Sequence, residues 1–300
     1  MGRRGQWPAD PEPLPAPVID NHTHLDSIGD VLDSDVADPG VAGQLRRAAA
    51  VGVPAAVQIG CDLDSARTSL QWAHDHQQLV AGVAIHPNEA VLHAGIDEVA
   101  PDGLAPAPQP RHAHGLDEAI ALIADLARDQ RVRTIGETGL DYFRAGDRGR
   151  ATQRQSFRAH IALAKELGLP MQIHDRDAHA DVLEILDADG APEVTVFHCF
   201  SGEADFAAEC VRRGYYLSFA GPVTFAKADY LRQAASGVPL TQILVETDAP
   251  YLTPAPYRGA PNAPYLLPHT VRCLAQVCQV ELEVFCSQVH RTCLDLYGPW

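Results

Sequence analysis

Lysine is nearly absent from this chain of 300 residues, whose 23 basic side chains include only Lys165 and Lys227. The formal net charge of -16 disfavours broad, non-specific attraction to a polyanion. A substrate that carries phosphate would therefore have to be attracted by bound cations or by local arginines. With 46% hydrophobic residues, the chain has the composition of a globular protein with a large core and not that of a disordered one.

The sequence also lacks a Cys-x-x-Cys pair, a signal-peptide pattern and any long apolar run. Its seven cysteines, an odd number, indicate reduced thiols in a cytoplasmic protein. The four cysteines between 273 and 293 lie in helix-like sequence and are typical of small buried side chains, not of a zinc cage. No stretch reaches the roughly 20 apolar residues of a membrane-spanning helix, so we expect no membrane contact. Residues 1–16 are rich in proline and without periodicity, which predicts a flexible tail.

From about Pro17 onward, short apolar runs alternate with amphipathic segments. Strands are predicted near 17–22, 55–60, 79–85, 132–137, 170–174, 194–198, 215–219 and 242–247. Helices are predicted near 41–51, 63–77, 116–129, 150–167, 178–188, 203–213, 227–236, 266–279 and 281–296. This rhythm favours a (β/α)₈ TIM barrel formed by one domain over 17–300, with a doubly wound open sheet as the alternative.

One stretch, 90–115, shows no such rhythm and contains several prolines. A connection of this length is usually a lid or a disordered insertion. We predict an extended loop inserted after the third strand. Its histidines, His93, His112 and His114, are interpreted as solvated.

Side chains that bind metals end five of the predicted strands. In Asp20-Asn21-His22-Thr23-His24, residues two apart point to the same face of a strand, so two imidazoles backed by a carboxylate would project together. The other four strands end in Glu137, His174, His198 and Asp248. Each residue alone could cap a strand or begin a helix. Because barrel enzymes build their sites at this face, the coincidence predicts a shared site, and six ligands suit two divalent ions better than one zinc.

Several motifs resemble those of the TatD family of metal-dependent deoxyribonucleases, a branch of the amidohydrolase-like barrels. The resemblance runs from about Val18 to Gly298. Its motifs are Asp20-x-His22-x-His24, Gly136-Glu137-Thr138-Gly139-Leu140-Asp141-Tyr142, His174-x-Arg176-Asp177-Ala178, His198-Cys199-Phe200-Ser201-Gly202 and Glu246-Thr247-Asp248-Ala249-Pro250-Tyr251-Leu252. Related barrels often bridge their metals with a carboxylated lysine from the fourth strand, where this chain has Glu137.

The resemblance implies two divalent ions, Zn²⁺, Mn²⁺ or Mg²⁺, that activate water for attack on a phosphodiester. It places one ion on His22, His24, Glu137 and Asp248, and the other on Glu137, His174 and His198. Asp248 is the expected general base, with Glu137 as its catalytic partner. Asp20 and Glu246 are expected to hold the ligands in place, although ordinary satisfaction of buried polar groups explains them equally well.

The resemblance also suggests substrate-binding residues: His86, Arg176, Tyr251, Arg258 and Asn262. A salt bridge to Asp175 or Asp177 is the plain alternative for Arg176. In the loop after the eighth strand, Pro261 and Ala263 replace the basic and acidic residues common in the family, which leaves its substrate contacts open.

We therefore expect a deoxyribonuclease, acting as a 3′ to 5′ exonuclease on single-stranded DNA ends or oligonucleotides, with no obligate protein partner. An amide or ester hydrolase is the first alternative, because the same activated water could attack a carbonyl. Removal of a D-amino acid from transfer RNA is one such reaction. A non-catalytic metal-binding protein is the second alternative, and the complete ligand set weighs against it.

Overall fold

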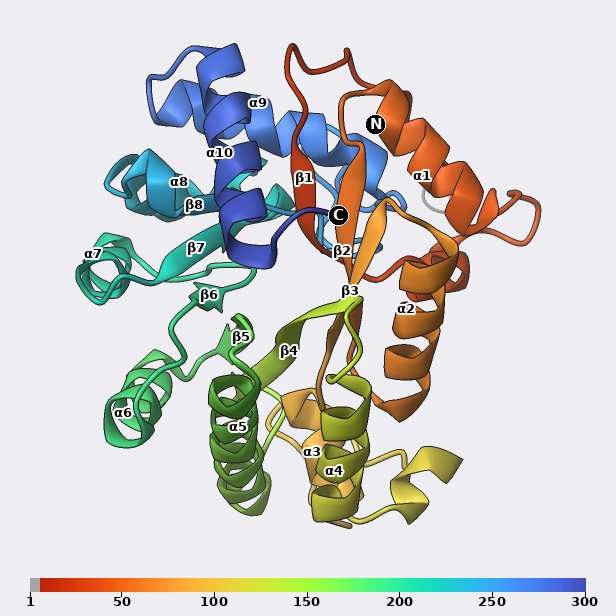
Figure 1. The fold of residues 1–300 in the computed structure, drawn as a ribbon, viewed down its shortest axis with the longest axis vertical. Coiled ribbons are helices and arrows are strands. Elements are labelled where there is room, and N and C mark those ends of the chain that lie inside the picture. The colour runs from red at the N-terminus through yellow and green to blue at the C-terminus, as the bar shows by residue number, and fades with distance from the viewer. Residues whose placement is uncertain (1–5) are drawn as a thin grey trace. The chain divides into compact units, whose positions relative to one another are not determined.

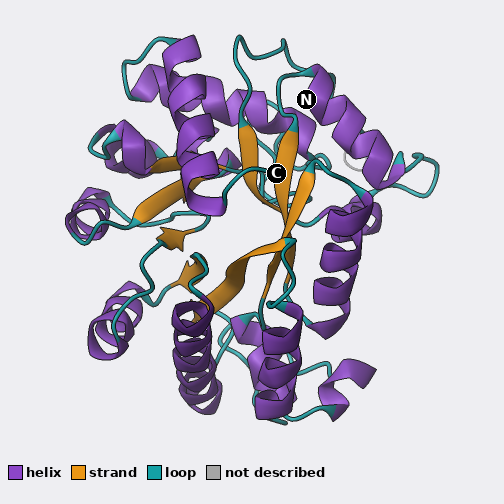
Figure 2. Cartoon of the chain, viewed as in Figure 1, coloured by secondary structure: helices purple, strands orange, loops and turns teal. Residues whose placement is uncertain are grey.

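Each strand of the protein is followed along the chain by at least one helix (Figure 2). The structure, a computed structural model, describes residues 6–300. Its strands are β1 (Ile19–Thr23), β2 (Ala55–Gly60), β3 (Leu79–Val83), β4 (Val132–Asp141), β5 (Met171–Arg176), β6 (Thr195–Phe197), β7 (Tyr216–Phe219) and β8 (Ile243–Val245). Its α-helices are α1 (Gly40–Ala50), α2 (Leu63–Asp75), α3 (Pro87–His93), α4 (Leu116–Leu126), α5 (Asp147–Leu167), α6 (His179–Asp189), α7 (Ala204–Arg212), α8 (Asp229–Ser236), α9 (Leu267–Val277) and α10 (Leu282–Tyr297).

The chain divides into two compact units, and the first contains both chain ends. This unit comprises the residues up to Gln58, Asp75–Val80 and Cys199–Trp300. In it, β1 pairs in parallel with β2, β7 pairs in parallel with β8, and a parallel bridge joins Thr23 to Ala249 just beyond the ends of β1 and β8. Helix α10 packs against β1 and β8 (Figure 1). The carboxyl ends of β8 and β1 therefore lie side by side.

The second unit comprises Ile59–His74 and Ala81–His198. Here β3 pairs with β4, β4 with β5, and β5 with β6, all in parallel. Strand β4 continues to Asp141, beyond its predicted end, because its pairing with β5 extends to Asp141 opposite Arg176. The long helix α5 packs on β4 and buries Phe157 completely.

The strand order settles the fold class. The eight strands follow one another from β1 to β8 in one sheet, and the bridge after β8 returns to β1. A doubly wound sheet would reverse its strand order at a switch point, which this sheet does not do. The predicted (β/α)₈ barrel is therefore confirmed. Among residues 6–300, no helix combines the length and the apolar character needed to cross a membrane.

The N-terminal segment departs from the predicted flexible tail. The Trp7 ring packs edge-on against Tyr265, with ring centroids 6.2 Å apart, and the Tyr265 hydroxyl donates to the Pro8 carbonyl at 2.8 Å. Leu14 is buried, and its backbone N–H donates to the Val51 carbonyl at 3.1 Å. Apolar residues between the prolines supply this burial, and the prolines lower the entropy cost of ordering the segment. Residues 1–5 of the predicted tail lie outside the described residues.

The stretch 90–115 also differs from its prediction. Helix α3 begins with Pro87 at its first position, where proline favours a helix. His93 is only 4% exposed, and the His112 side chain and Arg111 both contact the Glu89 carboxylate at 2.8 Å. The solvated interpretation is therefore wrong for His93 and His112, because Glu89 on α3 gives the insertion a partly buried anionic partner.

His160 on α5 gives the fold a sensitivity to acid. Its Nδ1–H donates to the Ser156 carbonyl at 2.8 Å, and its Nε2 accepts from the Ile85 N–H at 3.1 Å. Burial lowers the pKa of His160 to about 4. The unfolded chain, with a histidine pKa near 6.5, therefore binds a proton first as the pH falls. We expect His160 to cost nothing above pH ~6.5 and on the order of 3 kcal/mol of stability below pH ~4.

Urea unfolding of the metal-free protein checks this expectation. Between pH ~7 and ~4.5, His160→Gln should lose about 2 kcal/mol less stability than the wild-type chain, since an amide keeps a donor and an acceptor without titrating. Equal losses in the two proteins would contradict the assignment.

Candidate metal centre

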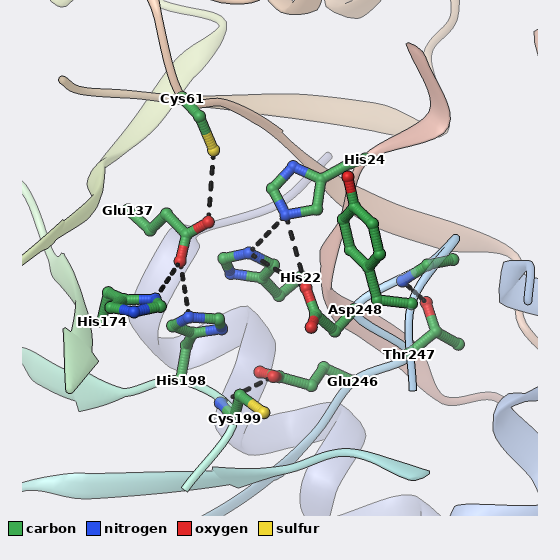
Figure 3. A network of polar contacts seen from close by, with 12 residues as sticks. His22, His24, Cys61, Glu137, His174, His198, Cys199, Glu246, Thr247 and Asp248 are labelled. Carbon is green, nitrogen blue, oxygen red and sulfur yellow. Dashed lines mark hydrogen bonds and ion pairs between the residues drawn. The ribbon is translucent and has the colours of Figure 1, made fainter. Parts of the chain in front are cut away.

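Two histidines and an aspartate converge at the ends of β1 and β8 (Figure 3). We call His22, His24 and Asp248 the His22 cluster. The Nε2 atoms of His22 and His24 lie 3.1 Å apart, and Asp248 Oδ1 lies 3.4 Å from His24 Nε2 and 3.9 Å from His22 Nε2. The alternation along β1 therefore brings the His-x-His pair together as predicted, and the pairing of β8 with β1 supplies the carboxylate.

Two further carboxylates hold the backbone around the His22 cluster. Asp20 accepts from the Thr247 N–H at 2.8 Å, from the Thr247 hydroxyl at 2.5 Å and from the His22 N–H at 3.3 Å. Glu246 accepts from the Cys199 N–H at 2.7 Å and the Ser218 hydroxyl at 2.5 Å. Both carboxylates are completely buried. Through these bonds both carboxylates anchor segments next to the candidate ligands.

A second cluster gathers around Glu137 at the end of β4. Glu137 Oε2 lies 2.6 Å from His198 Nε2 and 3.1 Å from His174 Nδ1, and we call these three residues the Glu137 cluster (Figure 3). Glu137 and His198 are buried, and His174 is nearly so. They come from the neighbouring strands β4, β5 and β6, which explains their convergence.

Three residues that the sequence did not assign as ligands or supports also contact the Glu137 cluster. Asp141 Oδ2 lies 3.2 Å from His174 Nε2, on the side of the ring opposite Glu137. Cys61 Sγ lies 3.2 Å from Glu137 Oε1, and His86 Nε2 lies 3.9 Å from the same oxygen and 3.4 Å from His174 Nδ1. His86, predicted to bind substrate, thus sits among the ligand candidates. Asp141 follows Glu137 by four residues, and residues four apart on a strand point to the same face. The sequence would predict this contact only if the fourth strand were known to continue to Asp141.

The charges of the Glu137 cluster are strongly coupled. Burial alone would raise the pKa of Glu137, but His198, His86 and His174 together hold it well below its ordinary value. Burial lowers the pKa of His174, but the hydrogen bonds to Asp141 and Glu137 raise it by more, and the resulting pKa is about 9. Burial lowers the pKa of His86 to about 4 and raises that of Asp20 to about 7. Without a cation, the cluster is therefore an ionised carboxylate held by a protonated His174.

The loops that follow the ligand strands contain left-handed residues other than glycine. Cys199 has φ of 44°, Asp248 of 52°, Leu252 of 56° and Asp177 of 57°. This conformation is costly for side chains with a Cβ and collects at functional sites. Here it occurs just after β5, β6 and β8, close to His174 and His198 and at Asp248 itself.

The model of the family described as TatD related DNase matches residues 19–298. The chain belongs to the TatD family. A relative described as "Uncharacterized metal-dependent hydrolase TatD", from Mycobacterium tuberculosis, is 42% identical over 264 residues, 87% of this chain and 90% of the relative. "Uncharacterized metal-dependent hydrolase YabD" from Bacillus subtilis is 32% identical over 272 residues, 90% of this chain and 94% of the relative.

Two solved structures of TatD proteins share the fold. The Escherichia coli TatD homologue YJJV matches with a TM-score of 0.74 and 24% identity, over 94% of this chain and 98% of its own. A TatD family hydrolase from Entamoeba histolytica matches with a TM-score of 0.77 and 18% identity, over 96% and 100%. The protein is thus a metal-dependent hydrolase of the TatD family.

The remaining residues suggested by the TatD resemblance differ in their surroundings. Arg176 lies over the Phe143 ring at 4.0 Å, while Asp175 bonds to His179, so the alternative pairing with Asp175 is not formed. Tyr251 is 52% exposed, with its ring 6.1 Å from that of His24. Asn262 is completely buried and donates to the carbonyls of Thr247 and Tyr251. The amide hydrogens of Asn262 thus hold the loop after β8, and its role in substrate binding stays a prediction.

Proposed function

We propose that this TatD protein is a two-metal phosphodiesterase that removes nucleotides from the 3′ ends of single-stranded DNA. The observation that carries the proposal is the pair of clusters, each rich in imidazole and carboxylate, at the carboxyl ends of strands in one parallel sheet. Active sites of barrel enzymes are built at this face. None of the seven cysteines, all of which lie among the described residues, forms a disulfide, which supports the further proposal that the protein works in the reducing cytoplasm.

The donor atoms fit divalent cations. Two ligands at the usual zinc distance of 2.0–2.1 Å and a tetrahedral angle lie about 3.3 Å apart. The pairs His22–His24, His24–Asp248 and Glu137–His174 lie 3.1, 3.4 and 3.1 Å apart. Glu137–His198, at 2.6 Å, is closer than this, and His22–Asp248, at 3.9 Å, is wider. Asp141, on the far side of the His174 ring, completes the carboxylate–histidine arrangement that orients metal-bound imidazoles.

We infer from the TatD resemblance that Glu137 would serve both ions. One ion would be held by His22, His24, Asp248 and Glu137, and the other by Glu137, His174 and His198. Glu137 supports this role because its Oε2 lies against His174 and His198, while its Oε1 faces a second set of donors, Cys61 Sγ at 3.2 Å and His86 Nε2 at 3.9 Å. Two bound divalent ions supply charge neutralisation of the phosphate and a lowered pKa of bound water.

The side chains supply the remaining steps. Asp248 is the proposed base, because its carboxylate borders both histidines and is 12% exposed, so that it can take a proton from water at the site. Arg176 is fixed on Phe143 by stacking, and a guanidinium there can donate two hydrogen bonds to phosphate oxygens. Arg176 and the two divalent ions would supply local positive charge against the net charge of -16, which disfavours contact with nucleic acid.

The test uses metal-free protein reloaded separately with Zn²⁺, Mn²⁺ and Mg²⁺. We expect stepwise shortening of a 5′-labelled single-stranded oligonucleotide with at least one ion, and none after chelation. The same preparations are offered an ester, an amide and a D-aminoacyl-tRNA. Turnover of one of these substrates without any shortening of the oligonucleotide would favour the carbonyl hydrolase. No turnover of any substrate, with metal bound, would favour a non-catalytic metal-binding protein.

A further inference from the structure

A pocket of about 370 Å³ begins two residues after Asp248, in the first unit of the chain. Its walls come from the loop after β8, from the 3₁₀ helix Leu25–Val31 after β1 and from the segment after β7. The lining residues are Val31, Phe225, Pro250, Leu252, Thr253, Arg258, Gly259, Ala260 and Pro261. The volume lies within the range of about 300–1,000 Å³ found for small-molecule sites. It suits one nucleoside rather than a length of strand.

The lining is apolar apart from Thr253 and a single charged residue, Arg258. Pro261, one of the two departures from the common TatD pattern, stands in this wall together with Pro250 and Leu252. Leu252 takes its left-handed conformation here, and its carbonyl lies where a Cβ on residue 221 would fall. This close approach holds the wall in place. The lining offers few side-chain hydrogen-bond donors, whereas a phosphate group would need several.

Arg258 lies over Phe225, with its guanidinium carbon 4.6 Å from the ring centroid. The arginine is exposed, and the phenylalanine beneath it is partly buried. No carboxylate among the described residues pairs with Arg258, so the Phe225 ring is the partner that the structure gives its guanidinium. A guanidinium held on an aromatic ring presents its other face to a further planar group, and proteins stack unpaired bases on such planes.

We propose that this pocket receives the base of the nucleotide that is removed, stacked on the outer face of Arg258. The inference rests on the proposed function and names its terminal subsite. Stacking on a base is tolerant of sequence and independent of backbone charge, which suits a protein whose net charge of -16 works against phosphate contacts. The pocket would thus make recognition of the strand end depend on the presence of a terminal base and not on which base it is.

The experiment compares metal-loaded wild-type protein with Arg258→Ala and Arg258→Lys. Each is given two oligonucleotides that differ only in whether the 3′-terminal nucleotide carries a base or is abasic. The wild type should remove the normal nucleotide with kcat/KM about tenfold or more above the abasic one. Both variants should reduce this ratio to about threefold or less, because lysine retains the charge but lacks the plane. Arg212→Ala, an exposed arginine on α7, is the matched control and should keep the wild-type ratio.

The outcomes separate the subsite from the proposed function. A wild-type ratio near one, or a ratio that Arg258→Ala leaves unchanged, overturns the subsite while the nuclease stands. If the wild type shortens no oligonucleotide, the proposed function fails, and the subsite is tested by binding of the fluorescent nucleoside 2-aminopurine deoxyriboside. Saturable quenching that weakens about tenfold in Arg258→Ala would sustain the pocket. Quenching that is absent, or equal in the two proteins, would overturn it.

Discussion

Asp248→Asn should abolish turnover of single-stranded DNA while the protein stays folded. Asparagine has the shape of aspartate and tolerates the left-handed φ of 52° at this position. The backbone bond from residue 248 to the His22 carbonyl, 2.9 Å long, does not depend on the side chain. The amide cannot accept a proton from water, and loss of a general base costs about 10²–10⁴-fold in rate.

Metal content separates the two roles of Asp248. Retention of both ions with the loss of kcat would show that Asp248 acts as a base, whereas loss of one ion would show that its charge is needed to hold metal. Asp295→Asn on the exposed surface of α10 makes the same chemical change away from the site and should behave as the wild type. A kcat for Asp248→Asn within about twofold of the wild type, with metal bound, would refute the assignment.

The sequence predicts the ligand pair on β1 because a strand fixes the direction of every second side chain. It predicts the barrel from the alternation of strands and helices, and a barrel brings the ends of its strands to one face. Asp141 escapes assignment as a support because the extension of β4 depends on pairing with β5, which is decided about 35 residues further along the chain. Local pattern therefore predicts the candidate ligands but not Asp141, which contacts His174.

The two predictions that differ from the structure, the flexible tail and the solvated histidines of 90–115, share one physical origin. Trp7 packs against Tyr265, and His112 against Glu89, so that each finds its partner through the folded chain and not within a window of sequence. Proline-rich composition predicts disorder only when no such partner exists. The orientation of Arg258 over Phe225 is equally non-local, because it depends on how the loop after β8 folds back.

Glu137→Gln should remove the metal centre more completely than any other single change. Glu137 is 5% exposed, contacts His174 and His198, and faces Cys61 with its other oxygen. A neutral amide offers one weak acceptor oxygen and cannot bridge two cations. Changes in groups that merely orient ligands cost about 10–100-fold in metal affinity or activity, so the loss of Glu137, if it serves both ions as proposed, should exceed about 100-fold in kcat/KM.

The variant should also change the metal-free protein. Glu137 is the buried partner of the protonated His174, and removal of one member of a buried ion pair costs about 3–5 kcal/mol. The pKa of His174 should fall from about 9, since one of the two carboxylates that raise it is gone, and NMR titration of the imidazole would follow this change. Glu184→Gln, at an exposed ion pair with Arg154, is the matched control, for which a cost below about 1 kcal/mol is expected. A Glu137→Gln protein that still binds two ions and turns over DNA would show that the two clusters do not share this carboxylate, and each would then have to hold its ion independently.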